Sequence, residues 1–162
     1  ERCSIRKFEE KDLEDEKLEK ILEASNLAPS AGNLQALKIA VVKEKEKKKA
    51  LARAALDQEF VGEAAVVLVF LQDPKESSWR YGRRGEELYS LQDATIACSY
   101  AQLAATNLGL GSCWVGTFDE GEVRKIINAP PDLRPVALLP LGYPAESPSK
   151  RERKTLSEIL LE

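Results

Sequence analysis

The sequence predicts a single domain, residues 1–162, in which helices and strands surround one buried helix. A chain of 162 residues is the usual length for one domain with one hydrophobic core. Charged residues make up 31% of the chain, yet none occurs between Asp93 and Asp119. Two apolar runs, 64–71 and 136–141, have the length and composition of buried strands. An uncharged run this long in so charged a chain must be removed from water, which makes it the centre of the fold.

The uncharged run begins with the predicted central helix. One face carries small neutral polar groups at helical spacing, and the other faces are apolar. The polar face consists of Gln92, Thr95, Ser99, Gln102 and Thr106. This polar content argues against a membrane span and favours a buried helix whose small side chains let other backbones approach closely. Asn107 and Gly109 end the helix near Leu108, and 112–118 (SCWVGTF) predicts a short buried strand.

The elements before the central helix are predicted from their periodicity. Asp15 can cap a helix that runs to Leu27 and is stopped by Pro29. A strand follows at 36–42, and 43–56 predicts a charged helix on the surface. The run at 64–71 predicts a central strand. The segment 73–87 has the character of a loop with a short helix, and its aromatic residues can either line a substrate site or cover the core.

After the central helix, 120–128 predicts a short amphipathic helix and 136–141 another strand. From Ala145 the composition changes to Pro, Ser and charged residues, with apolar residues only at the end. Such a tail has little core of its own. We therefore expect residues 145–162 to pack on another molecule, such as a partner subunit.

The composition excludes several classes of function. Histidine is absent, which rules out Ser-His-Asp and Cys-His catalysis and His-dependent metal sites. The net charge of -3 argues against non-specific nucleic-acid binding. Three cysteines without CxxC spacing, Cys3, Cys98 and Cys113, predict reduced core cysteines and neither a disulfide framework nor a zinc site. We find no signal peptide or membrane span, so we expect a soluble, cytoplasmic protein.

Two segments have side chains suited to ligand binding. Arg2, Ser4 and Arg6 alternate, so in an extended segment they point the same way and offer paired donors to a phosphate group. A solvated basic terminus is the alternative. The loop 28–35 (APSAGNLQ) carries Ser30, Asn33 and Gln35, whose neutral groups suit the edge of a planar heterocycle. Considered alone, this loop can also be a plain connector.

Taken together in chain order, these segments resemble the nitroreductase family of flavoproteins. The matching stretches are RCSIRKF, APSAGNLQ, the QDATIA helix leading into GLGSCWVG, LLPLGYP and RERKTLSEI. The resemblance implies an α+β fold with a mixed, mainly antiparallel sheet surrounded by helices. It also implies an intertwined homodimer with FMN at the interface, so that each site uses residues from both chains.

The resemblance also implies roles for particular residues, and none of them is a catalytic side chain or a metal ligand. The N-terminal segment and the late basic pair hold the phosphate, the loop meets the flavin of the partner chain, and the segment after the central helix approaches flavin N5. The cofactor-binding residues implied are Arg2, Cys3, Ser4, Arg6, Pro29, Ser30, Asn33, Gln35, Gln58, Val115, Gly116, Arg151 and Arg153. The chain departs from the family at Ala36 and Leu37, where relatives commonly have Pro and an aromatic residue.

The function implied is that of an FMN-dependent oxidoreductase, which transfers hydride from NAD(P)H through flavin N5 to nitroaromatic, quinone or similar acceptors. Because the flavin ring performs the electron chemistry, the missing histidine is no obstacle. Three alternatives stay open at this point: a non-catalytic flavin-binding protein, a reductive dehalogenase or flavin-modifying enzyme of the same fold, and a purely structural dimer module.

Overall fold

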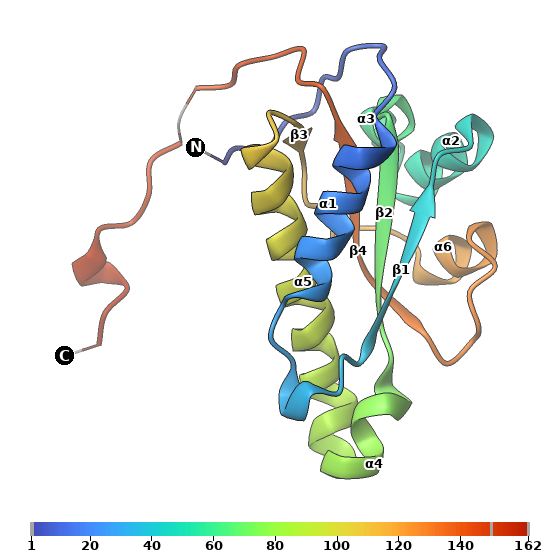
Figure 1. Cartoon of the computed structure of the whole chain (residues 1–162), viewed down its shortest axis with the longest axis vertical. Helices are drawn as coiled ribbons and strands as arrows, with labels where there is room; N and C mark the ends of the chain where they lie inside the picture. Colours follow the sequence, from blue (N-terminus) through green and yellow to red (C-terminus); the bar gives the residue numbers. More distant parts are fainter. Residues whose placement is uncertain (1, 150, 162) are drawn as a thin grey trace.

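The sheet of the protein is antiparallel and has helices on both faces (Figure 1). The structure is a computed structural model that describes residues 2–149 and 151–161. In the described part of the chain the strand order is β1-β2-β4-β3. The strands are β1 (Leu37–Val42), β2 (Val66–Gln72), β3 (Gly111–Ser112) and β4 (Arg134–Gly142). Every neighbouring pair is antiparallel, and a parallel bridge from Ser4 to Ser112 makes the sheet mixed at its β3 edge.

The two central strands are buried on both faces, which explains their continuous apolar sequences. Along β2, Val66, Leu68 and Phe70 face one hydrophobic cluster. The alternate residues Val67, Val69 and Leu71 face the other. Because side chains alternate between the faces of a strand, each face must be apolar when both are covered. The prediction of a central strand at 64–71 is confirmed.

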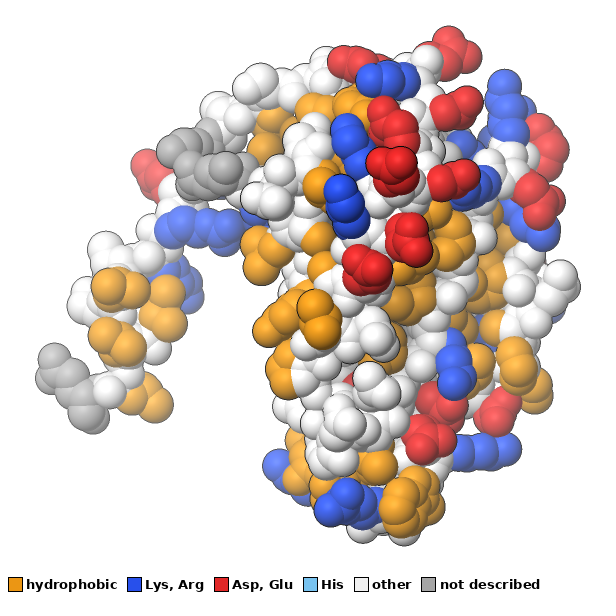
Figure 2. All heavy atoms as spheres, viewed as in Figure 1, with side chains coloured by type: hydrophobic (Ala, Val, Ile, Leu, Met, Phe, Trp, Pro, Cys, Tyr) orange, Lys and Arg blue, Asp and Glu red, His pale blue; other side chains and the backbone are white. Residues whose placement is uncertain are grey.

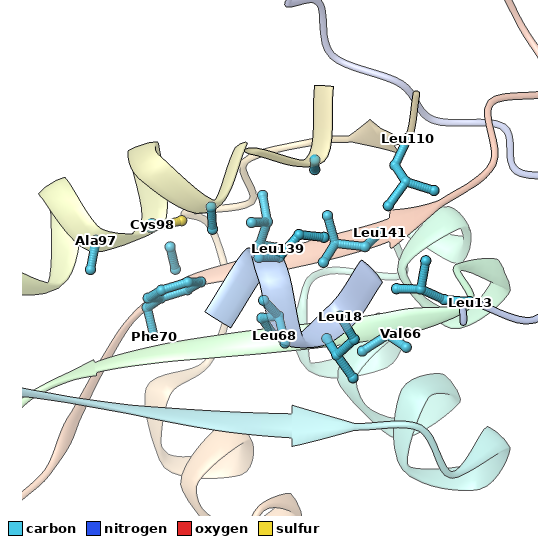
Figure 3. Packing of buried hydrophobic residues seen from close by; sticks show 14 residues of the cluster. Leu13, Leu18, Val66, Leu68, Phe70, Ala97, Cys98, Leu110, Leu139 and Leu141 are labelled. Carbon is cyan, nitrogen blue, oxygen red and sulfur yellow. The ribbon is translucent and has the colours of Figure 1, made fainter. Parts of the chain in front are cut away.

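Different helices cover the two faces of the sheet. The first cluster lies between the sheet and the helices α1 (Asp15–Asn26) and α5 (Ser90–Asn107), and Figure 3 shows this packing around Phe70 and Leu139. The second cluster lies under α2 (Lys45–Ala54), α3 (Glu59–Glu63) and α6 (Glu120–Ile126). Helix α4 (Pro74–Arg84) and the π-helical turn η2 (Gly85–Tyr89) lead from β2 into α5. Two short 3-10 turns complete the elements, η1 (Ala31–Asn33) and η3 (Leu156–Glu158).

Two local predictions are wrong. The segment 112–118 is not a strand, because after Ser112 only Val115 pairs with β4, through an isolated bridge to Leu138. Its apolar composition reports burial, and burial does not require a continuous ladder of hydrogen bonds. Asp15 is not the N-cap of the first helix, since Glu14 occupies that position and makes no side-chain capping bond.

The central helix is only partly buried within one chain. Helix α5 ends at Asn107 as predicted, and one side of it packs on the sheet through Ala97, Ala101 and Ala105. The opposite side is open: Leu103 is 59% and Tyr100 40% exposed. The prediction that the whole uncharged helix is removed from water is therefore wrong for the single chain. Apolar side chains gathered on one exposed helix face are typical of a surface that another molecule covers.

The tail after Ala145 leaves the body of the protein (Figure 1). Residues 147–149 and 151–161 are all exposed, including Leu156, Ile159, Leu160 and Leu161. Figure 2 shows hydrophobic side chains on the tail and on the side of the body nearest to it. The tail thus has no core within its own chain, as its composition indicates.

Candidate functional site

The N-terminal segment is held against the ends of β3 and β4. The Ile5 N–H donates to the Ser112 carbonyl at 2.9 Å, and further on the Glu9 N–H donates to the Tyr143 carbonyl at 2.9 Å. Ile5 is buried, and a Cβ at Gly111 would lie only 2.8–2.9 Å from its side chain. Glycine at this position therefore allows the N-terminal segment to approach β3 closely.

Three side chains of this segment converge on Cys113. Burial raises the pKa of the Cys113 thiol, whereas the charges of Arg6 and Arg2 and a hydrogen bond with Ser4 lower this pKa. The bridge between Ser4 and Ser112 places this segment beside Cys113. No carboxylate forms an ion pair with either guanidinium within the part of the chain that the structure describes. The result is a cationic cluster, which we call the Arg2–Arg6 cluster, next to the segment that follows α5.

The backbone of the Arg2–Arg6 cluster is fixed by Glu146. Its carboxylate accepts hydrogen bonds from the backbone N–H groups of Arg6 and Lys7. The Ala145 N–H also donates to the Lys7 carbonyl at 2.9 Å. These bonds anchor the start of the tail beside the cluster. Cys3, between the two arginines in the sequence, is a free and exposed thiol, so the prediction of a core cysteine is wrong for Cys3, whereas Cys98 and Cys113 are buried as predicted.

Gln58 lies beside the segment that carries Val115 and Gly116. The Gln58 side-chain amide donates to the Ala55 carbonyl at 2.8 Å and reaches the Thr117 carbonyl at 3.5 Å. Val115 is 3% exposed, and both its backbone groups pair with Leu138, at 3.0 and 2.9 Å. Gly116 is exposed. Val115 and Gly116 are both predicted to approach flavin N5. In the single chain only Gly116 is exposed, because Val115 is buried.

The loop 28–35 is held in place by Asp93, a residue that sequence reasoning missed. Asp93 is 2% exposed, and its two carboxylate oxygens accept from the Ala31 N–H at 3.0 Å and the Ala36 N–H at 3.1 Å. A carboxylate at the buried start of α5 therefore holds the middle of the loop and the residue that follows it. The available signal was a lone charge at the boundary of an uncharged helix.

Within this loop the backbone is strained and the polar side chains are exposed. Asn33 and Gln35 both have positive φ, 58° and 51°, a conformation that non-glycine residues rarely adopt. Ser30 Oγ accepts from the Gln35 N–H at 3.0 Å, which supports this conformation. Asn33, Gln35 and Pro29 are exposed. Strain of this kind persists where the surrounding structure enforces it, commonly at ligand sites.

One chain does not bring all the predicted residues together. The Arg2–Arg6 cluster lies near the C-terminal end of α5, whereas the loop 28–35 lies at its N-terminal end (Figure 1). An 18-residue helix separates them, which is about 27 Å. Arg151 and Arg153 are exposed in the tail, and neither forms a hydrogen bond or ion pair with other described residues. The two halves of the predicted site can therefore meet only if a second chain supplies one of them.

A hollow in the surface lies elsewhere. It has a volume of about 1070 Å³ and is lined by segment 8–12 and by α2 and α3. Acidic and basic side chains mix in it, and none of the predicted site residues lines it. Lys48 is one of the lining residues and donates hydrogen bonds to the Ala64 and Ala65 carbonyls at 2.6 and 3.0 Å. No helix within residues 2–149 and 151–161 is long and apolar enough to cross a membrane.

Comparison with known proteins identifies relatives of the whole chain. A family model described as "Nitroreductase family" matches residues 1–62 and 50–143. A protein of Archaeoglobus fulgidus named "Putative NADH dehydrogenase/NAD(P)H nitroreductase" is 34% identical over 149 residues, which cover 90% of this chain and 82% of the relative.

Solved structures share the fold. An NADPH:FMN oxidoreductase from Vibrio harveyi, complexed with NAD+, has a TM-score of 0.90 at 27% identity, covering 99% of this chain and 73% of its own. An FMN-dependent nitroreductase from Clostridium difficile R20291 has a TM-score of 0.79 at 30% identity, covering 97% of this chain and 90% of its own. The α+β fold expected from the sequence is thereby confirmed.

Proposed function

Because the chain belongs to the nitroreductase family, we propose that it is an FMN-dependent oxidoreductase that passes hydride from NAD(P)H to small acceptors such as nitroaromatics or quinones. That it is an NAD(P)H-dependent flavin oxidoreductase follows from the activities named for its relatives. FMN as the particular flavin, and the class of acceptor, are our proposals. One observation carries the choice of FMN: the N-terminal segment, with Arg2, Ser4 and Arg6, lies beside Cys113 and supplies two guanidinium groups and a hydroxyl there. The class of acceptor is proposed from the names of the relatives.

The Arg2–Arg6 cluster fits the phosphate of FMN. A phosphate dianion is bound best by guanidinium groups and a hydroxyl that point together, because charge-assisted hydrogen bonds are about twice as strong as neutral ones. Arg2, Arg6 and Ser4 supply these groups, and no carboxylate of the described chain neutralises the two guanidiniums. We propose that Arg151 and Arg153, in the tail that starts beside the cluster at Glu146, join them on the phosphate.

The loop 28–35 fits the ring of the flavin. Its neutral donors and acceptors lie on a backbone that Asp93 fixes at Ala31 and Ala36. Such groups can bond to the edge of a heterocycle without titrating near neutral pH. The bound flavin supplies the hydride-accepting ring, and the protein supplies binding, orientation and fixed donors. Gly116 presents a residue without a side chain, which leaves room for a planar ligand.

We further propose that the active form is a homodimer. The exposed apolar face of α5, the coreless tail and the separation of the two half-sites all support it. Leu103→Lys places a charge on that face and should weaken the dimer in sedimentation velocity experiments. Val41→Lys, on the edge strand β1 and 41% exposed, is the matched control and should leave the dimer unchanged. Monomeric wild-type protein that still binds FMN would contradict the proposal.

The experiment that tests the function is flavin binding by an Arg6 variant. The purified protein should be yellow and release FMN. Arg6→Ala should weaken FMN binding by about 10- to 100-fold, since a hydrogen bond to a charged group contributes about 1.5–3 kcal/mol. Riboflavin lacks the phosphate, so its affinity should change far less.

Lys7→Ala, at the next position along the segment, is the control for the loss of a positive charge. Equal losses for FMN and riboflavin would remove the phosphate assignment. Turnover of NADH with menadione separates an enzyme from a flavin carrier, because a carrier binds FMN without oxidising NADH.

A further inference from the structure

We propose that aromatic and basic side chains around α4 form a subsite for a planar ligand that carries an anionic group. The inference rests on the proposed reductase function and names a substrate class for the same site. The residues are Trp79, Arg80, Tyr81, Arg84 and Tyr89, which we call the α4 cluster. Sequence analysis left open whether aromatic residues here line a substrate site or cover the core.

The α4 cluster consists of two aromatic rings in contact and the guanidinium groups next to them. The rings of Tyr81 and Tyr89 meet edge to face, with their centroids 5.1 Å apart. Arg80 lies 5.4 Å from the centroid of the Tyr81 ring, and Arg84 lies 5.4 Å from that of Tyr89. The Arg84 Nε–H also donates to the Tyr89 hydroxyl at 3.0 Å. These contacts hold the arginines over aromatic faces, where they remain available to an anion.

The α4 cluster contacts the loop that we assign to the flavin ring. A Cβ at Gly32, in the middle of that loop, would lie 2.3 Å from the Tyr81 hydroxyl oxygen and 3.0 Å from Arg80 Nη1. Both side chains therefore pack directly on the loop. A ligand that stacks on a flavin held by this loop lies at the border of the cluster.

Exposure and charge distinguish the α4 cluster from an ordinary surface. Trp79 is 69% exposed, so its ring does not cover the core. No carboxylate pairs with Arg80 in the ranges 2–149 and 151–161, whereas the neighbouring Arg83 pairs with Glu87 at 2.7 Å. Figure 2 shows hydrophobic and basic side chains together at the end of the molecule where Figure 1 places α4. An exposed indole and a guanidinium without an ion-pair partner, on the same short helix, suit a flat ring with a negative group.

Two sources can supply this chemistry. NADPH combines the flat adenine ring with an anionic 2′-phosphate on the ribose. A nitroaromatic carboxylate combines a flat ring with an anionic carboxylate. We expect Arg80→Ala to raise KM about 10-fold for whichever of these the α4 cluster binds, as for the loss of one charge-assisted contact. The kcat should stay nearly unchanged. NADH and the uncharged acceptor menadione should be used as before.

Arg83→Ala is the matched control, because it removes the same charge from the same helix but from an existing ion pair. Steady-state kinetics of wild type, Arg80→Ala and Arg83→Ala would compare NADPH with NADH and 4-nitrobenzoate with nitrobenzene. Calorimetric titration with adenosine 2′,5′-bisphosphate and with 4-nitrobenzoate gives a second readout that does not depend on turnover. It also separates failure of this inference from failure of the reductase function.

A selective loss for NADPH and the bisphosphate assigns the α4 cluster to the cofactor substrate. A selective loss for 4-nitrobenzoate assigns it to the acceptor. Three results would overturn the inference: equal effects of the two variants, no calorimetric binding of either probe to wild type, or a change in dimer dissociation with KM unchanged.

Discussion

Asp93 provides the sharpest test of how the chain builds its site. Its buried carboxylate accepts two backbone hydrogen bonds, at 3.0 Å from Ala31 within loop 28–35 and at 3.1 Å from Ala36 directly after it. Each bond to a charged acceptor is worth about 1.5–3 kcal/mol, and an unpaired buried N–H costs about 1–3 kcal/mol. We therefore expect Asp93→Ala to lower the free energy of unfolding by about 3–5 kcal/mol.

A loss of this size is a large part of the total stability of a domain, about 5–15 kcal/mol. Asp93→Asn is the milder variant, because the amide keeps one acceptor oxygen of the same shape. It should cost about 1.5–3 kcal/mol. Asp119→Ala is the matched control: its carboxylate caps α6 by accepting from the Glu122 N–H at 2.9 Å, far from the loop. Loss of such a cap typically costs about 1 kcal/mol.

The assay is urea unfolding of apoprotein at one fixed protein concentration, followed by FMN titration of the folded variants. Asp93→Asn should also weaken FMN binding about 10-fold, since displaced loop donors lose roughly one hydrogen bond to the ring. Asp119→Ala should leave FMN binding unchanged. If Asp93→Asn costs no more stability than Asp119→Ala, the two hydrogen bonds of Asp93 are unimportant. If it costs stability and FMN affinity is unaffected, the loop does not meet the flavin.

Two further predictions concern the loop and the surface. Gly32→Ala should lower the free energy of unfolding by about 1–3 kcal/mol, because φ of Gly32 is +57° and the new methyl group would meet the Tyr81 hydroxyl. Adding Tyr81→Phe should restore part of this loss, measured by urea unfolding. The Glu120–Arg134 pair, which lowers the pKa of Glu120, should contribute up to about 1 kcal/mol. Because the pKa of Glu120 is lower in the folded than in the unfolded state, this contribution is present above about pH 4.3 and is lost as the pH falls through the pKa of the folded protein. The free energies of unfolding of wild type and Arg134→Ala should therefore differ at pH 7 and converge near pH 3.

The core of the fold could be predicted from the sequence because its signals are local. Strand β2 is apolar at every position since both of its faces are covered, and α5 is free of charge after Asp93 since it packs closely. The segment 112–118 could not be predicted, because burial at Cys113 and Val115 gives the same composition with or without a ladder of hydrogen bonds. Asp93 was missed because its partners are backbone groups, so the charge at the start of the uncharged helix did not indicate what it binds.

The exposed face of α5 illustrates a second limit. Its sequence is as free of charge as that of a fully buried helix, yet Tyr100 and Leu103 are exposed in the single chain. The composition of a helix face reflects whether that face is buried in the functional state of the protein. The burial can come from the same chain or from another molecule. A lack of charge on a face that the chain leaves open is therefore evidence about assembly.

The same reasoning joins assembly to cofactor binding. Within one chain the Arg2–Arg6 cluster and the loop 28–35 lie at opposite ends of α5, about 27 Å apart, and the rigid helix between them cannot shorten. We therefore infer that the phosphate-binding half of one chain and the ring-binding half of another form each site. A flavin that contacts both halves binds the dimer better than the monomer, so it must stabilise the dimer by the corresponding free energy. Flavin affinity should consequently fall when the protein is diluted below its dimer dissociation constant, and dimer dissociation should be suppressed by FMN more strongly than by riboflavin, because only FMN engages the cationic cluster.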